Sequence, residues 1–191
     1  ADLGIKVINT PGINSPHVAK FAVETLGLTS SAARDDGVKA VVIGAGSVGQ
    51  CVIDLMTSAG VEPTVVSRSR ALPLETALVG ATHVAVCAAT SSTEPILSAM
   101  HVEALLGGEA RPIRIVSVSR PEAFSLDAIM QIANHEGPQG PLELRFDYGD
   151  STLAPTRAKV NEGGVKTNVT WSSVAMASEE CKQDMDEAVL S

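Results

Sequence analysis

The residues best suited to chemistry in this sequence form a glycine-rich stretch after an apolar segment. Residues 44–49 read Gly44-Ala45-Gly46-Ser47-Val48-Gly49 and match the pattern G-x-G-x-x-G. Gly44 would make a tight turn, Gly46 would let a pyrophosphate approach the backbone, and Gly49 would let the following helix pack closely. Ser47 and Val48 would begin that helix, whose N-terminus favours an anion. The alternative is that the glycines serve only a tight turn between a strand and a helix.

A second chemical signal follows the next apolar run, at Ser67-Arg68-Ser69-Arg70. Sites that take NAD carry an acidic side chain here, which accepts hydrogen bonds from the ribose hydroxyl groups. A carboxylate would repel a 2′-phosphate, whereas Arg68 and the hydroxyl groups of Ser67 and Ser69 would bind one through charge-assisted hydrogen bonds. The sequence therefore favours NADP as the cofactor, with NAD as the second choice. The alternative is that both arginines are ordinary solvated charges.

Composition excludes several classes of function. The 191 residues carry a formal net charge of -8, which argues against a nucleic-acid partner. No stretch approaches the roughly 18 apolar residues of a membrane span. The three cysteines, Cys51, Cys87 and Cys181, have unrelated spacings that suggest neither a disulfide framework nor a zinc site. We expect buried thiols, no metal, no membrane partner and a location in the cytoplasm.

The elements that must position these residues alternate along the chain. Apolar runs predict strands at 40–43, 64–66, 83–88, 113–118 and 142–146. Helical spacing predicts helices at 48–60, at 94–106 beginning at Pro95, at 127–133 and at 178–190, and a helix or turn at 71–79. Residues 149–167 keep no apolar period and predict a loop. We therefore expect a doubly wound parallel α/β sheet of the Rossmann type, in one NAD(P)-binding domain over residues 1–191.

Three stretches resemble the D-2-hydroxyacid dehydrogenases, and together they span nearly the whole chain. Residues 4–15, with Val18-Ala19, resemble the segment by which the chain of that family enters its cofactor domain, and we assign residues 1–30 to it. Residues 116–120 resemble the strand and turn that carry the substrate-binding arginine, and residues 175–185 are similar to the helix after the catalytic histidine. The resemblance implies an NAD(P)-dependent oxidoreductase. Ala89 and Ser119, which follow the third and fourth strands, complete the predicted cofactor-binding residues.

The resemblance also implies that Arg120 pairs with the carboxylate of a small anionic substrate. The planar two-donor fork of a guanidinium group suits that role. The alternative is a structural ion pair at the end of a strand, and Pro121 stands where the family usually has glycine.

The proton donor of the family has no clear counterpart in this sequence. Hydride transfer to a 2-keto acid needs an acid near the carbonyl group, and the family uses a histidine held by a carboxylate. Matching the following helix places Ser173 at the histidine position, while Thr152 falls near the place of the carboxylate and Asp150 is the closest acidic residue. Ser173 and Asp150 therefore join Arg120 as candidate catalytic residues. The four histidines lie elsewhere: His17, His83, His101 and His135.

The family also has a substrate domain of about a hundred residues ahead of this point, whereas this chain begins at Ala1. The chain is then a fragment or processed product, or another subunit supplies the missing wall, or the protein is a lone nucleotide-binding module. An apolar face left by the absent domain would predict a homo-oligomer or a partner chain.

Functions of two classes follow from these residues. An NAD(P)-dependent oxidoreductase with altered acid-base residues would keep both the glycine loop and Arg120. A non-catalytic nucleotide-binding module for regulation or assembly would keep the glycine loop alone, and the loss of both acid-base groups favours it. A weaker likeness links residues 67–69 and 89–97 to the NADPH domain of glutamyl-tRNA reductase, although the chain shows neither a nucleophilic cysteine nor a basic surface for tRNA.

Overall fold

A computed structural model describes residues 12–29, 37–69, 72–90, 94–108, 111–137, 140–164, 166–175 and 178–190. Six parallel strands form one sheet in the order β2-β1-β3-β4-β5-β6. Their bounds are β1 Ala40–Ile43, β2 Thr64–Val66, β3 His83–Val86, β4 Ile113–Ser117, β5 Leu142–Asp147 and β6 Val169–Ser172. The predicted doubly wound α/β fold is confirmed.

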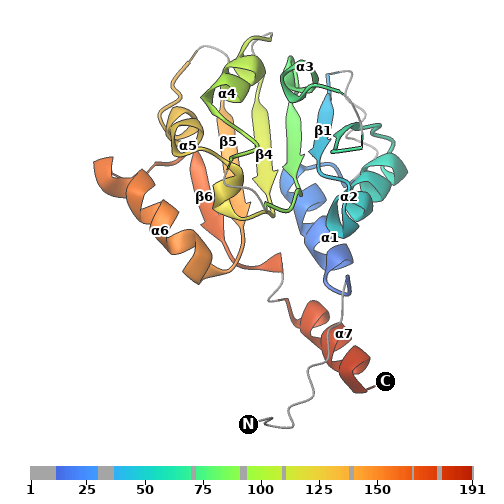
Figure 1. Ribbon diagram of the computed structural model, residues 1–191. Coiled ribbons are helices and arrows are strands. Elements are labelled where there is room, and N and C mark those ends of the chain that lie inside the picture. The colour runs from blue at the N-terminus through green and yellow to red at the C-terminus, as the bar shows by residue number, and fades with distance from the viewer. Residues whose placement is uncertain are drawn as a thin grey trace.

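Helices cover both faces of the sheet (Figure 1). On one face lie α1 (Ser15–Leu26) and α2 (Ser47–Ser58), which pack on the apolar side chains of β1, β3 and β4. On the other face lie α3 Leu74–Leu78, α4 Ala99–Leu106, α5 Leu126–Ala133 and α6 Asp150–Val160. Because β1 is buried on both faces, its sequence is a continuous apolar run and does not alternate.

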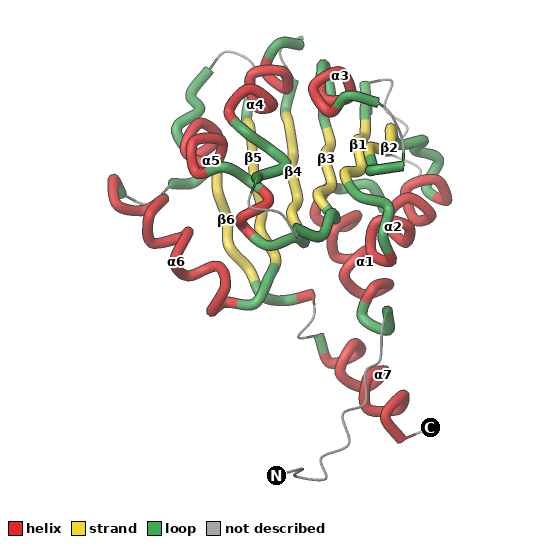
Figure 2. The backbone as a smooth tube through the Cα atoms, viewed as in Figure 1, coloured by secondary structure: helices red, strands yellow, loops and turns green. Residues whose placement is uncertain are grey.

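The strand order reverses at β1. The chain leaves β1 through α2 to β2 on one side, and then returns through α3 to β3 on the other side (Figure 2). The crossovers diverge here, which leaves a crevice beyond the carboxyl ends of β1 and β3. The glycine loop follows β1 directly and therefore lies in that crevice.

The loop predicted over 149–167 is largely wrong. Residues 150–160 form α6, and a short 3-10 turn follows at Asn161–Gly163. The helix buries only Leu153 and Val160 fully, two turns apart, and it contains Pro155. So narrow a buried stripe leaves almost no apolar period in the sequence.

The helix predicted at 94–106 begins later than expected. The amides of Ile96 and Leu97 both donate to the carbonyl of Ala123, which keeps this stretch extended beside the loop after β4. The helix starts at Ala99, after Ser98, whose backbone N–H donates to Nδ1 of His101.

The sequence predicted the last helix of the chain but not the first helix or the last strand. The closing helix predicted at 178–190 is confirmed as α7 (Glu179–Leu190), which extends away from the sheet beside α1 (Figure 1). The sequence did not predict β6, and it left α1 within the segment 1–30, of which residues 1–11 and 30 lie outside the described part. Within the described residues, no helix is long and apolar enough to cross a bilayer.

Candidate functional site

A cleft of about 840 Å³ opens at the carboxyl ends of β1, β2 and β3. Its walls come from the glycine loop, the turn after β2, and the segments that follow β3. The lining residues are Ile43, Gly44, Ala45, Gly46, Ser47, Val48, Val66, Ser67, Arg68, Ser69, Leu74, Cys87, Ala88, Ala89, Thr90, Glu94, Pro95 and Ile96. The cleft therefore unites most of the residues predicted to bind a cofactor.

Two of the glycines are required by close backbone packing. Gly44 has a φ of +98°, and a Cβ on it would lie 2.6 Å from the backbone nitrogen of Ala88. A Cβ on Gly49 would lie 1.9 Å from the carbonyl oxygen of Gly44. Gly49 does not line the cleft, but it lets α2 begin directly against the loop. The predicted roles of Gly44 and Gly49 agree with this packing.

The N-terminus of α2 opens into the cleft at Gly46. Gly46 caps the helix without a side chain, and the first turn of α2 contains no acidic residue. A Cβ on Gly46 would meet no protein atom within 4 Å, so the space over the loop is open. The exposed amides and the helix dipole at Ser47 and Val48 favour a negative group there. The cleft thus fits the pyrophosphate of a dinucleotide.

The turn after β2 forms the rim of the cleft. The hydroxyl groups of Ser67 and Ser69 lie 3.0 Å apart, and Arg68, the residue between them in the sequence, is exposed and lines the cleft. Glu94 is the acidic residue among the lining residues, and it belongs to the segment after β3 and not to the end of β2. Arg70, the other arginine of the predicted motif, lies outside the described residues.

Cys87, which follows β3 directly, is one of the residues that line the cleft. Burial raises the pKa of the Cys87 thiol to about 12, so this thiol stays protonated at neutral pH. A thiol that stays protonated is a poor nucleophile. Cys87 is half-buried where it lines the cleft, and Cys51 is half-buried as well, so the predicted burial of the thiols is confirmed at Cys181 alone.

Of the two remaining residues predicted to bind the cofactor, Ala89 and Ser119, only Ala89 lines the cleft. Ala89 lines the cleft, whereas the hydroxyl group of Ser119 is occupied by the carbonyl oxygens of Ala88 and Val86, at 2.8 and 3.2 Å. Ser119 therefore holds the segment that lines the cleft and does not itself line it.

Arg120 follows Ser119 at the carboxyl end of β4. It is exposed, and within the described part of the chain its side chain makes no hydrogen bond or ion pair. The structural ion pair that was the alternative role is therefore not formed there. The guanidinium group is open to an anion from solvent.

The loop after β6 is anchored by a residue that the sequence analysis did not select. Asp147, the buried last residue of β5, accepts hydrogen bonds from the hydroxyl group of Ser172 and from the amides of Val174 and Ala175, at 2.8, 2.8 and 3.0 Å. An acidic residue at the end of an apolar strand is the signal that could have found it. The carboxylate fixes the backbone around Ser173.

The predicted catalytic residues are not assembled with one another. Ser173 is exposed in the loop held by Asp147. Asp150 begins α6 and pairs with Arg157 of the same helix at 3.0 Å, while Thr152 is half-buried in that helix. No polar contact joins Ser173, Asp150 and Arg120 within the described residues.

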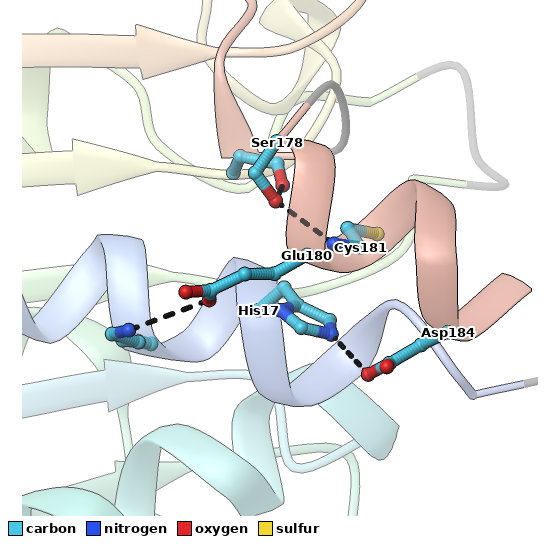
Figure 3. A network of polar contacts seen from close by, with 7 residues as sticks. His17, Ser178, Glu180, Cys181 and Asp184 are labelled. Carbon is cyan, nitrogen blue, oxygen red and sulfur yellow. Dashed lines mark hydrogen bonds and ion pairs between the residues drawn. The ribbon is translucent and has the colours of Figure 1, made fainter.

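The four histidines have separate environments. His83 lies at the amino end of β3, where burial and the nearby charge of Arg114 lower its pKa. His101 caps α4, and the Nε2 atom of His135 is buried without a partner in the described part of the chain. His17 of α1 pairs with Asp184 of α7, with Nε2 2.7 Å from Oδ2 (Figure 3). Sequence reasoning had set this histidine aside.

No protein-family model and no curated protein sequence matches the chain. Among solved structures it is similar to apo D-lactate dehydrogenase from Escherichia coli, with a TM-score of 0.68 and 16% identity over 99% of this chain and 67% of that one. It is also similar to a putative formate dehydrogenase from Pyrobaculum aerophilum, with a TM-score of 0.69 and 23% identity over 94% of this chain and 67% of that one. For D-lactate dehydrogenase from Aquifex aeolicus, complexed with NAD and lactic acid, the TM-score is 0.67 and the identity is 15%, over 98% of this chain and 68% of that one. These identities show a shared fold, and the chain spans about two thirds of each structure.

Proposed function

We propose that this chain is the dinucleotide-binding part of an NAD(P)-dependent oxidoreductase related to the D-2-hydroxyacid dehydrogenases. The observation that carries the proposal is the cleft itself, where the glycine loop and the N-terminus of α2, which no side chain caps, line the same space as the Ser67-Arg68-Ser69 turn. The shared fold with dehydrogenases supports it, as does the sequence resemblance at residues 116–120. A bound dinucleotide would supply or accept a hydride, while the chain holds and orients it.

We further propose that the cofactor is NADP. Arg68 and its two flanking hydroxyl groups offer charge and hydrogen bonds to a 2′-phosphate, and no acidic side chain occupies positions 67–69. The pyrophosphate would lie at the start of α2 and the adenosine ribose at the rim near Arg68. NAD would bind the same cleft without the contact to Arg68.

Fluorescence titration with NADPH and NADH tests both parts of the proposal. We expect the wild-type chain to bind NADPH about tenfold more tightly than NADH, because a charged hydrogen bond contributes roughly 1.5 kcal/mol or more. Arg68→Ala should remove this preference and leave NADH binding nearly unchanged. Arg114→Ala, which removes an exposed arginine from the far end of β4, is the matched control. Failure of the wild-type chain to bind either dinucleotide would overturn the proposal.

Arg120 supplies the substrate side of the proposal. Its exposed guanidinium group at the carboxyl edge suits the carboxylate of a 2-keto or 2-hydroxy acid. Oxamate, which mimics a 2-keto acid, should bind to the NADPH complex and lose most of its affinity in Arg120→Ala. Equal binding by the wild-type and variant proteins would exclude Arg120 from the site.

A non-catalytic nucleotide-binding module is the second candidate. The observation that favours it is the separation of Ser173 and Asp150, since Asp150 is paired with Arg157 and a serine hydroxyl is a poor acid at neutral pH. Hydride transfer from NADPH to any of a set of 2-keto acids would exclude this candidate.

We also propose that the protein works in the cytoplasm and as an assembly. Its three cysteines are free, which suits a reducing compartment. Val174, 53% exposed in the loop after β6, is an apolar side chain that a second copy or a partner chain would cover. Sedimentation as a clean monomer would count against a homo-oligomer.

A further inference from the structure

Helix α1 runs opposite to the strands beneath it. Near its C-terminal end, Leu26 shares a pocket of about 290 Å³ with Arg114 and Glu143, the second residues of β4 and β5. Earlier in the helix, the ring of Phe21 lies under Arg145, with the guanidinium carbon 4.9 Å from the ring centroid. Because Arg145 is nearer the carboxyl end of β5 than Glu143, α1 must begin at the carboxyl edge of the sheet.

His17 therefore lies at the edge where substrate is proposed to bind. It precedes Phe21 by four residues, so it shares that face of α1 and lies about 6 Å nearer the edge. The two residues from Arg145 to Asp147 cover about 7 Å along β5. His17 is thus level with Asp147, which anchors the loop after β6, and Arg120 leaves β4 at the same edge.

The contact between His17 and Asp184 leaves one ring nitrogen free. Figure 3 shows the imidazole of α1 and the carboxylate of α7 facing each other. A carboxylate only accepts hydrogen bonds, so Nε2 donates to Asp184 and Nδ1 is the other nitrogen of the ring. Among the described residues Nδ1 has no hydrogen-bond partner. The polar atoms that are buried without a partner belong to Gln131 and His135, so Nδ1 of His17 is not a buried atom. The side chain is 15% exposed, so Nδ1 is open to solvent.

We propose that His17 is the proton donor of the oxidoreductase proposed above, and that Asp184 positions its ring. The inference rests on that function. In the reduction of a keto group, a bound reduced dinucleotide would supply a hydride to the carbonyl carbon and be oxidised, as the carbon-oxygen π bond breaks. The carbonyl oxygen takes a proton from Nδ1 of the protonated ring, which becomes neutral and keeps its Nε2–H on Asp184. Imidazole exchanges protons near neutral pH, which a serine hydroxyl does not.

The competing explanation is that the pair only docks α7 on α1. The same two helices are joined one turn further along by Lys20 and Glu180, at 3.6 Å, and both of these side chains are largely exposed. Lys20→Ala removes a docking contact of the same kind without touching the imidazole. It is therefore the matched control for His17→Gln.

Nitrogen NMR of the histidine rings gives a test that does not need turnover. The probe is oxamate, added to protein saturated with NADPH. We expect the Nδ1 resonance of His17 to shift with oxamate in the wild-type and Lys20→Ala proteins, and not in Arg120→Ala. An unchanged Nδ1 resonance in a protein that binds NADPH would overturn the inference alone. Absence of NADPH binding would overturn both the proposed function and this inference.

Kinetics with glyoxylate as the keto acid give the second test. His17→Gln should lower kcat about 100-fold with little change in KM, since a positioned acid contributes roughly 10²-fold or more. Asp184→Asn should lower kcat about tenfold and shift the pH profile, because the ring loses its orienting partner. His17→Asn repeats the test if the glutamine variant does not fold. An equal loss in His17→Gln and Lys20→Ala would assign the pair to helix docking and overturn the proposal.

Discussion

The two halves of the carboxyl edge are built in different ways. At β1–β3 the cleft is shaped by backbone, since Gly44, Gly49 and Ala88 pack too closely for any added carbon. At β4–β6 the edge is shaped by side chains, because Asp147 binds the next loop and Arg120 projects into solvent. A backbone site can be recognised from a short local pattern, whereas a side-chain site depends on residues far apart in the sequence.

Gly49→Ala should break the first half most severely. The added carbon would lie 1.9 Å from the carbonyl oxygen of Gly44, so α2 or the loop must move. We expect a loss of about 3 kcal/mol in the free energy of unfolding, measured with urea, and loss of dinucleotide binding.

Gly46→Ala is the matched control in the same loop. Its φ is -76° and nothing lies within 4 Å of the added carbon, so the free energy of unfolding should change by less than about 1 kcal/mol. Dinucleotide affinity should still fall, because the methyl group occupies the space over the loop. Equal destabilisation by the two alanines would refute the packing argument for Gly49.

Asp147→Asn tests the second half. The amide can accept only on its oxygen, so its NH₂ group would face a donor that now binds the carboxylate. We expect a cost of about 2 kcal/mol and faster hydrogen exchange at Val174 and Ala175. Asp150→Asn removes only an exposed partner of Arg157 and should cost less than about 1 kcal/mol.

The reactivity of the cysteines measures how often α7 separates from α1, compared with the cleft at β1–β3. Cys181 is buried where α7 meets α1, and burial and then the charge of Asp184 raise its pKa. Two surface ion pairs hold α7 there, so local opening should expose Cys181 to reagent, whereas Cys87 is half-buried in the cleft and its pKa of about 12 keeps it protonated and slow to react. With Cys51 replaced by serine, Ellman's reagent should label Cys181 at least about tenfold faster than Cys87. Similar rates would contradict a local opening of α7.

The smallest expected effect concerns His83, at the amino edge away from both halves. Because burial and Arg114 lower its pKa below the ordinary value of 6.5, the unfolded chain takes up this proton before the folded chain does. The contribution of neutral His83 to stability is therefore present above pH 6.5 and is lost as pH falls below it. His83→Gln should reduce the fall in Tm between pH 7.5 and 5.5 by about 1 °C, and an unchanged pH dependence would contradict this.

Most of the sheet could be predicted because each strand from β1 to β5 is a local apolar run. The strand β6 was not predicted because it packs on a residue far away in the sequence. Trp171 of β6 stacks on Phe146 of β5, with the ring centroids 4.8 Å apart. Helix α6 escaped because only Leu153 and Val160 are fully buried in it. In both cases the element is stabilised by the tertiary packing and not by its own pattern.

The candidate site divides in the same manner. The glycine loop and the turn at 67–69 are contiguous in sequence, so their residues could be assigned from spacing alone. His17 and Asp184 lie 167 positions apart and meet only because α7 returns to α1. No local pattern could pair these two residues.

The strand order also bears on how the protein avoids aggregation. The strands at the two edges are short, with three residues in β2 and four in β6. An exposed edge offers unpaired backbone groups to another chain, and its hazard grows with its length. Such short edge strands offer a foreign strand few backbone groups to pair with, so neither edge of the sheet, as the described residues form it, favours growth by strand addition.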